Sequence, residues 1–428
     1  MKRLILIFVV LLIGIPAIFI GKQFMPEKDI DAPAMPVANA AEQVLRGQYL
    51  ARAGDCMACH TTRGGTPYAG GRAIATPFGN IHSPNITPDV ATGIGSWSAN
   101  DFWRALHHGK SKDGSFLYPA FPYTNYTKVS RADSDALHAY FRTLPAVQQA
   151  NRPHALRFPY NQRMLLAVWR ALYFKPGVYA PDTTQSVDWN RGAYLVQGLG
   201  HCSACHSNRN VLGATGIKGD LGGGLIPVLN WYAPSLTSDA ETGLGSWEVQ
   251  DIADLLKTGV SARSTVFGPM AEVVRESLQH MSDADIHAMA GYLKTLPQTA
   301  AGQASGSVRT QGQGSEQVLK LGAALYEKHC AECHKAGGEG VPPAYPPLAG
   351  NRAITMPAAI NSIRMVLNGG FPPSTGGNPR PYGMPPFATE LNDEEVAAVV
   401  SYIRSSWGNQ GALVSAVEVG RSRAVPLD

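Results

Sequence analysis

The sequence is poor in charge and in cysteine for a chain of its length. Charged residues make up 16% of the 428 residues, and the formal net charge is +4 with Lys and Arg scattered, so a nucleic-acid-binding surface is not expected. Six cysteines are too few for a disulfide-built scaffold. The chain also lacks a dinucleotide-binding glycine fingerprint, a P-loop and a nucleophile elbow, which excludes catalytic sites built on those motifs.

Glycine and proline, in contrast, are plentiful. The chain has 45 Gly and 31 Pro, which favours small, loop-rich modules. At about 150 residues per domain, the length corresponds to roughly three domains.

The N-terminus carries an apolar segment. Lys2 and Arg3 precede a run from Leu4 to Gly21, which is long enough to match the ~30 Å hydrocarbon thickness of a bilayer. The positive-inside rule places the rest of the chain outside the cytoplasm. We expect an uncleaved helix that contacts lipid and anchors the chain at the periplasmic face of the bacterial inner membrane. The alternative is a secretory peptide cleaved at residues 38–40 (Ala-Asn-Ala), farther from the apolar run than is usual.

The six cysteines form three pairs, each with two residues between the thiols and a histidine directly after. The sequences are CMACH at 56–60, CSACH at 202–206 and CAECH at 330–334. This spacing places both thiols on one side of a helical turn, which is typical of covalent c-type haem attachment with the histidine as proximal iron ligand. We therefore predict three haems c, attached through Cys56, Cys59, Cys202, Cys205, Cys330 and Cys333 and ligated by His60, His206 and His334. A dithiol–disulfide oxidoreductase is the alternative.

The segments around these motifs repeat as well. A glycine precedes each motif on an amphipathic stretch, and a tyrosine lies on a helix that closes each unit. The glycines are Gly47, Gly192 and Gly322, and the tyrosines are Tyr140, Tyr292 and Tyr402. A small residue lets two helices approach closely while an aromatic side chain fills the space beside it. Each unit resembles the class I cytochromes c in this crossing, which implies a mainly α fold with three tandem cytochrome c domains.

The repeats set the expected boundaries. We predict an anchor or signal with its tether at 1–40, a first domain at 41–184, a second domain at 185–300, a linker at 301–315, a third domain at 316–410 and a tail at 411–428. The linker is rich in Gly, Ser and Gln, so we expect a hinge before the third domain. The aromatic stretch 153–181 belongs to no repeat and is either an inter-domain packing segment or a docking surface.

A low-spin haem c needs a sixth iron ligand, which is usually methionine or histidine. Met270 follows Gly-Pro, and Met384 lies between Gly383 and Pro385, both in loops before the closing helix. We predict that Met270 and Met384 bind the second and third irons. Core filling is the alternative for a lone methionine.

The first unit breaks this pattern, because Phe121 occupies the equivalent position. Phenylalanine cannot bind iron, so the first haem is either five-coordinate or bound by another side chain. The available imidazoles are His107, His108 and His82. We take His107 as the candidate ligand, because it follows Trp103 by one helical turn; an ordinary surface or propionate-bonding histidine is the alternative.

Prolyl carbonyls usually hold the second nitrogen of a proximal histidine and thereby fix its tautomer. The candidates are Pro84, Pro234 and Pro347.

Several stretches resemble one family over almost the whole chain. They are 85–95, 117–120, 268–274 and 290–297. The family is the triheme cytochrome c subunit of bacterial membrane-bound dehydrogenases that oxidise alcohols, aldehydes or sugar acids. The resemblance implies an electron-transfer subunit without catalytic residues of its own, which passes electrons from a periplasmic dehydrogenase subunit to membrane ubiquinone in the respiratory chain.

The resemblance also bears on the partner. Alcohol dehydrogenase subunits resemble this chain but have Met at the Phe121 position, whereas subunits of molybdenum-type enzymes often combine Phe there with His at the His107 position. A molybdopterin and iron–sulfur aldehyde dehydrogenase, with a small iron–sulfur subunit, is therefore the expected partner. The alternatives are a quinoprotein alcohol dehydrogenase, a flavin-dependent gluconate- or sorbitol-type dehydrogenase, or, from other classes, a haem peroxidase or a terminal-oxidase cytochrome subunit.

Overall fold

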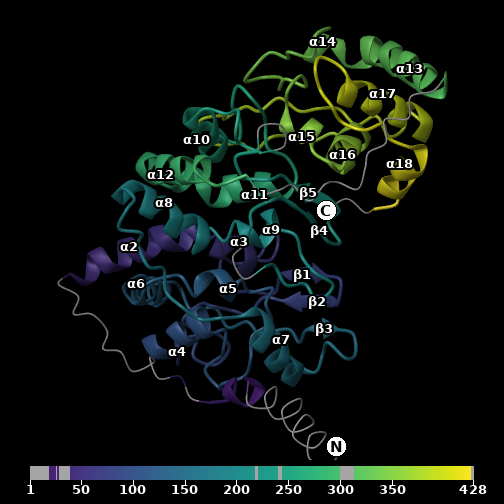
Figure 1. Cartoon of the computed structure of the whole chain (residues 1–428). Coiled ribbons are helices and arrows are strands. Elements are labelled where there is room, and N and C mark those ends of the chain that lie inside the picture. The colour runs from purple at the N-terminus through teal and green to yellow at the C-terminus, as the bar shows by residue number, and fades with distance from the viewer. Residues whose placement is uncertain are drawn as a thin grey trace, which may run out of the picture.

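The computed structural model describes residues 19–25, 27, 39–216, 220–239, 243–298 and 313–425. It is mainly helical, and the three predicted domain ranges follow one another from the bottom to the top of Figure 1. We call them the first, second and third unit, after the predicted ranges 41–184, 185–300 and 316–410.

The elements are as follows. The first unit has α2 (Ala40–Ala53), α3 (Cys56–His60), β1 (Ala73–Thr76), β2 (Gly79–His82), α4 (Ala99–Trp103), the π-helical turn η1 (Arg104–His108), α5 (Tyr123–Tyr126), α6 (Arg131–Phe141), β3 (Ala155–Leu156), η2 (Arg163–Leu165) and α7 (Leu166–Tyr173). The second unit has α8 (Val187–Gln197), α9 (Ser203–His206), β4 (Gly224–Ile226), β5 (Trp231–Ala233), α10 (Val249–Thr258), α11 (Pro269–Glu276), η3 (Leu278–His280) and α12 (Asp283–Lys294). The third has α13 (Gln313–His329), α14 (Ala331–His334), α15 (Arg352–Thr355), α16 (Ile360–Asn368) and α17 (Asp393–Ser405), and α18 (Ala416–Arg423) follows it.

The prediction of an N-terminal membrane anchor has to be corrected. In the described part of the chain, no helix is long and apolar enough to cross a membrane, so the expected anchoring, and the localisation based on it, find no support. Most of the apolar run, residues 1–18, lies outside the described residues. Two residues that follow the apolar run contact the first unit. The ring centroids of Phe24 and Phe116 lie 5.1 Å apart, and Glu27 forms an ion pair with Lys110.

In each unit the helix before the haem motif crosses the closing helix: α2 with α6, α8 with α12 and α13 with α17. A Cβ added at Gly47, Gly192 or Gly322 would lie well under 3.0 Å from the carbonyl oxygen of Ala136, Ala288 or Ala398 respectively. The Cβ atoms of Tyr140, Tyr292 and Tyr402 lie beside the same three sites. The predicted crossing is therefore confirmed, with glycine required because the two backbones nearly touch.

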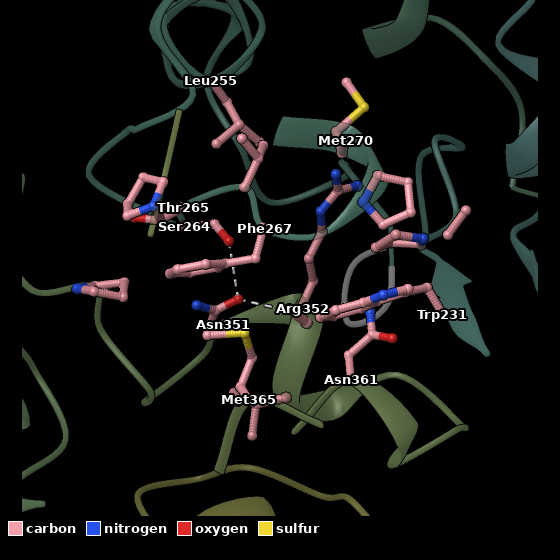
Figure 2. A pocket seen from close by; sticks show the side chains of 18 of the residues that line it. Trp231, Leu255, Ser264, Thr265, Phe267, Met270, Asn351, Arg352, Asn361 and Met365 are labelled. Carbon is pink, nitrogen blue, oxygen red and sulfur yellow. Dashed lines mark hydrogen bonds between the residues drawn. The ribbon is translucent and has the colours of Figure 1, made fainter. Parts of the chain in front are cut away.

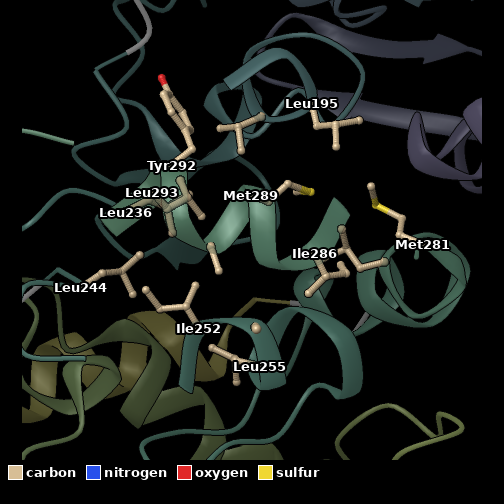
Figure 3. Close-up of a cluster of buried hydrophobic side chains, with 14 of the residues drawn as sticks. Leu195, Leu236, Leu244, Ile252, Leu255, Met281, Ile286, Met289, Tyr292 and Leu293 are labelled. Atoms are coloured by element: carbon tan, nitrogen blue, oxygen red, sulfur yellow. The ribbon is translucent and has the colours of Figure 1, made fainter. Parts of the chain in front are cut away.

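The closing helices begin at side-chain caps. Ser130, Ser282 and Asn392 each accept a hydrogen bond from the backbone N–H three residues later. Such caps satisfy one of the free N–H groups of the first turn and fix where the helix starts. Buried apolar side chains collect behind the crossings in three clusters, of which the one in the second unit is drawn in Figure 3.

The first and second units contact each other reciprocally. Each closing helix carries an aspartate that binds an arginine of its own unit and accepts a hydrogen bond from a tyrosine of the other unit. The two sets are Asp133 with Arg46 (2.6 Å) and Tyr194 (2.5 Å), and Asp285 with Arg191 (2.7 Å) and Tyr49 (2.5 Å). We call this arrangement the Tyr–Asp–Arg clasp. The third unit has Leu321 and Ala324 at the arginine and tyrosine positions, so it cannot form a clasp.

The third unit is not loosely attached, contrary to the expected hinge. Asn361 donates to Tyr232 O and accepts from Tyr232 N, both at 2.8 Å, and Thr375 Oγ1 donates to Thr258 O at 2.9 Å. Of the predicted linker 301–315, residues 301–312 lie outside the described residues, and α13 already begins at Gln313. The composition of a linker says nothing about contacts made elsewhere. The second and third units therefore form a packed seam.

The aromatic segment 153–181 packs between units, as one of its two interpretations predicts. It contributes β3 to an antiparallel sheet in the order β1–β2–β3, and Trp169 Nε1 donates to Leu212 O of the second unit at 3.0 Å. Arg170 lies over the rings of Phe116 and Phe174, at 5.1 and 4.8 Å from their centroids. The docking interpretation stays open, because Phe158 and Met164 of this segment remain exposed.

The helix crossing gives a stability prediction. We expect Gly192→Ala to lower the free energy of unfolding by about 1–3 kcal/mol, because the new methyl group overpacks against the Ala288 carbonyl. Gly291, on the partner helix α12, has open space around it. As a matched control, Gly291→Ala should be neutral or stabilise by up to ~1 kcal/mol, because alanine has the higher helix propensity. Equal destabilisation of both variants in denaturant titrations would contradict the packing argument.

Candidate haem sites

The three Cys-x-x-Cys-His motifs each form one helical turn, in α3, α9 and α14. All six cysteines are free thiols, and burial raises the pKa of Cys202 to about 12 and that of Cys330 to about 11. A redox-active dithiol needs an accessible thiolate with a lowered pKa. Raised pKa values at Cys202 and Cys330 disfavour the dithiol oxidoreductase alternative for these two motifs, and the free thiols fit covalent attachment to a haem placed against them.

The motif histidines are held in one tautomer. Their Nδ1 atoms lie close to prolyl carbonyl oxygens, which only accept hydrogen bonds, so Nδ1 carries the proton and Nε2 keeps its lone pair for a metal. The pairs are His60 with Pro84 (2.8 Å), His206 with Pro234 (2.7 Å) and His334 with Pro346 (3.0 Å). Burial lowers the pKa of all three imidazoles, to about 4 for His206, so they are neutral at pH 7 and ready to bind iron.

Pro84 and Pro234 are confirmed as these carbonyl partners, but Pro347 is wrong. The carbonyl of Pro347 instead accepts from Asn351 Nδ2 at 2.8 Å, and Asn351 also caps α15. The Pro347 carbonyl is therefore bonded to the residue that caps α15, and the preceding carbonyl, that of Pro346, is the one that contacts His334 Nδ1.

The second and third motifs open into one continuous cavity of about 340 Å³ with a mainly apolar lining. Its wall includes His206 with Met270 and His334 with Met384, so each motif has an imidazole and a thioether in a shared space. Figure 2 shows Met270 beside this pocket, on the first turn of α11. Backbone hydrogen bonds of 2.8 and 3.0 Å between Met384 and Gly370 fix the third-unit loop. The donor set and the apolar wall fit two haems c, whereas iron ligation by Met270 and Met384 stays a prediction.

The first unit has no methionine in this position, as the sequence indicates. The Phe121 and Tyr126 ring centroids lie 5.2 Å apart, and Phe121 packs on the cluster that Cys56 also contacts. His107 is 3% exposed, stacks on Trp103 at 4.3 Å between ring centroids and places Nδ1 3.3 Å from Thr127 Oγ1. It lies on the π-helical turn η1, a type of distortion that is frequent at functional sites. Its binding to iron stays a prediction.

The other two candidate imidazoles have different surroundings. His108 contacts His107 edge-on, with ring centroids 4.7 Å apart. His82 is held by the connecting segment: its Nδ1 lies 2.9 Å from Pro153 O, and its backbone N–H donates to His154 Nδ1 at 3.2 Å. These bonds make His82 part of the local fold of the first unit.

The first and second motifs lie next to each other (Figure 1). Asn125 Nδ2 donates to Ser203 Oγ of α9 at 2.9 Å, and Tyr126 OH donates to Gly54 O, just before α3, at 3.0 Å. His201, which directly precedes the second motif, packs on Tyr126 with ring centroids 5.7 Å apart. Sequence reasoning missed His201, because nothing in its neighbourhood along the chain signals a contact with the first unit.

The Arg72 side chain joins the first motif to α11, the helix of the second unit that carries Met270. Arg72 donates to the carbonyl of Ala58, inside the motif, and forms two bonds of 2.6 and 2.9 Å with Glu272 of α11. Next to it, Asp55 lines the large cavity, and its Oδ1 is buried without a hydrogen-bond partner. Burial, and after it the nearby Glu272, raise the pKa of Asp55 well above its usual value.

The placement of His107 gives a spectroscopic prediction. If His107 is the sixth ligand, His107→Ala in the haem-loaded protein should convert one haem from low to high spin, because alanine offers no replacement atom. The neighbouring variant His108→Ala is the matched control and should leave the spin state unchanged. Near-infrared and electron paramagnetic resonance spectra of the oxidised protein measure this. An unchanged spectrum of His107→Ala removes His107 as a ligand.

The chain matches the cytochrome c family model over residues 44–145 and 319–407. It is 43% identical over 399 residues to the gluconate 2-dehydrogenase cytochrome c subunit of Pantoea cypripedii, a match that covers 89% of each chain. It is 39% identical to the alcohol dehydrogenase (quinone) cytochrome c subunit of Gluconobacter oxydans, covering 90% of this chain and 84% of the relative. It is 38% identical to the fructose dehydrogenase cytochrome subunit of Gluconobacter japonicus, covering 92% and 87%.

These relatives are electron-transfer subunits rather than catalytic enzymes, and their similarity to this chain extends over nearly its full length. A cytochrome c fold implies covalent haem c, which agrees with the free thiols and neutral imidazoles of the motifs. The chain therefore belongs to the family of cytochrome c subunits of gluconate, alcohol and fructose dehydrogenase complexes.

Proposed function

We propose that this chain holds three covalent haems c and carries electrons from a periplasmic dehydrogenase subunit to ubiquinone. The observation that carries the proposal is the threefold occurrence of one site: a motif helix with two free thiols and an imidazole whose Nδ1 lies within hydrogen-bond distance of a prolyl carbonyl. Sequence resemblance to dehydrogenase subunits favours this function over a haem peroxidase or a terminal-oxidase cytochrome.

In this proposal each residue type has a defined role. The six cysteines attach the haems, His60, His206 and His334 are the proximal ligands, and Met270 and Met384 are the distal ligands. Bound haem supplies a one-electron iron couple. The chain orients each imidazole through its prolyl carbonyl and surrounds the second and third sites with apolar side chains, which exclude water. Thioether ligation and an apolar environment both raise the reduction potential.

The arrangement of the sites supports transfer in series. The first and second motifs are linked through Asn125 and Tyr126, and the second and third share one cavity wall. Electrons can pass along such a row without a mobile carrier, because consecutive sites are in near contact. We propose that one end of the row faces the dehydrogenase and that the other delivers to the quinone.

For the partner, we propose a molybdopterin and iron–sulfur aldehyde dehydrogenase with a small iron–sulfur subunit. Phe121 in the first haem pocket, together with His107, supports this choice, because the combination resembles subunits of that enzyme class. A quinoprotein alcohol dehydrogenase or a flavin-dependent gluconate- or sorbitol-type dehydrogenase is the second candidate. The specific observation in its favour is the set of gluconate, alcohol and fructose dehydrogenase relatives.

The distal ligands can be tested one at a time. We expect Met270→Ala and Met384→Ala each to remove about half of the sulfur-to-iron charge-transfer absorption that the two Met-ligated haems give together, and to lower one midpoint potential. Met365 lines the same cavity but lies on α16 and is not a predicted ligand, so Met365→Leu is the matched control. Loss of the band in Met365→Leu, or its retention in Met384→Ala, would show that the ligand is assigned wrongly.

The electron-transfer role is tested on the native complex. We expect the large subunit that copurifies with this chain to be a dehydrogenase, and the purified complex to reduce a ubiquinone analogue when given an aldehyde, with all haems cycling between oxidation states. Reduction by an alcohol or a sugar acid in place of an aldehyde would select the second candidate partner. A complex that reduces no quinone analogue with any of these substrates would refute the proposed function.

A further inference from the structure

We propose that Arg352, which belongs to the third unit, completes the haem site of the second unit as the cationic partner of a haem propionate. The inference rests on the proposed function in one respect, namely that the second unit holds a haem. It adds a residue from a neighbouring unit that no haem motif predicts.

The side chain of Arg352 crosses the seam between the units. Arg352 is the first residue of α15, and its Nη1 donates to Ser235 O of the second unit at 2.7 Å. Ser235 directly follows Pro234, whose carbonyl braces His206. The guanidinium also lies 5.0 Å from the centre of the Trp247 ring. Figure 2 shows the side chain extending from the third unit toward the side of the pocket on which Met270 lies.

The positive charge of Arg352 is buried without a protein counter-ion. The residue is 7% exposed, and no carboxylate of a described residue lies within ion-pair distance of it. Burial lowers its pKa to about 10, which still leaves it charged at pH 7. A buried unpaired charge costs several kcal/mol, so an anion in the cavity would stabilise this arrangement.

The cavity wall itself does not supply that anion. Asp55 is an acidic residue of this wall, but it belongs to the first unit, and the cation that influences it is Arg72. A haem carries two propionate carboxylates, so a haem in the second unit would bring the missing negative charge. The bidentate geometry of a guanidinium suits a carboxylate.

Further donors face the same space. Arg352 uses one of its five N–H groups on protein, in the bond to Ser235. Trp247 is 2% exposed and lines the cavity, and its indole brings a second N–H donor to this part of the wall. Two donors at one wall are what an anionic group would need to be held in place.

A purely structural role explains less. Asn361 already connects the units with two hydrogen bonds to the Tyr232 backbone and needs no charge to do so. If Arg352 served only to join the units, a neutral side chain would avoid the cost of burying a cation. The buried positive charge of Arg352 is therefore the feature that an anionic ligand would explain.

The proposal predicts a shift in reduction potential. A cation near a haem disfavours the oxidised state, which carries one more positive charge, so Arg352 should raise the potential of the second haem. In Arg352→Gln one midpoint potential should fall, and it should become dependent on pH near neutrality, because the propionate loses its cation and its pKa rises. Arg352→Lys should shift less, since it keeps the charge but loses the bidentate fork.

The experiment is a redox titration of the haem-loaded full-length protein at several pH values, with resonance Raman spectra of the propionate modes. Asn361→Ala is the matched control: it loosens the seam without changing charge and should leave all potentials within error. The affected component should be the one that Met270→Ala also shifts. Haem content is measured on every variant. It shows whether a changed potential reflects the loss of Arg352 or the loss of the second haem, and so separates the role of Arg352 from the proposed electron-transfer function.

Three results would overturn the proposal: unchanged potentials and propionate modes in Arg352→Gln with full haem content, an equal shift in Asn361→Ala, or a shift in the component that Met384→Ala affects. In each of these cases the proposed electron-transfer function would stand. If the wild-type protein carried no haem on Cys202 and Cys205, the proposed function itself would fail for the second unit.

Discussion

Each unit depends on one point where two helix backbones nearly touch. Glycine faces an alanine carbonyl there, and the neighbouring tyrosine fills the remaining space, so the two helices have no freedom to slide. The short motif helix follows directly after the first of these two helices and is thereby held in place. The rest of the unit consists of loops and short helices, which wrap the space left in front of the motif. Such a core is small, and a bound haem would supply much of its apolar interior.

The sequence was informative where chemistry is local. The motif spacing, the glycine–tyrosine crossing and the carbonyl partners Pro84 and Pro234 could all be predicted, because each depends on residues within one repeat. Prediction failed where a distant residue decides. Asn351 commits Pro347 elsewhere, and the contacts of Asn361 with Tyr232 override a linker that looks flexible. The expected membrane anchor failed differently: a hydropathy pattern alone was taken for a spanning helix, and the described helices do not include one.

Charge and neutrality are divided between the seams and the sites. Inside the motifs, burial raises the pKa of the Cys202 and Cys330 thiols and lowers the pKa of the proximal imidazoles. Between units, the contacts are ionic or strongly polar: Arg72 with Glu272, and the two aspartates of the clasp. This division has a physical reason. A seam between preformed units gains specificity from directed, charged pairs.

The reciprocity of the Tyr–Asp–Arg clasp has an implication for descent. Two surfaces that contact each other through the same residues in both directions are related as the two halves of a symmetric dimer. A single-haem ancestor with this arginine, aspartate and tyrosine could have paired with a second copy of itself before duplication joined the two genes. Once both copies were in one chain, the two halves no longer had to stay identical. Methionine could then persist at position 270 while phenylalanine took the matching place at 121. In a homodimer both copies come from one gene, so the two positions could not have differed.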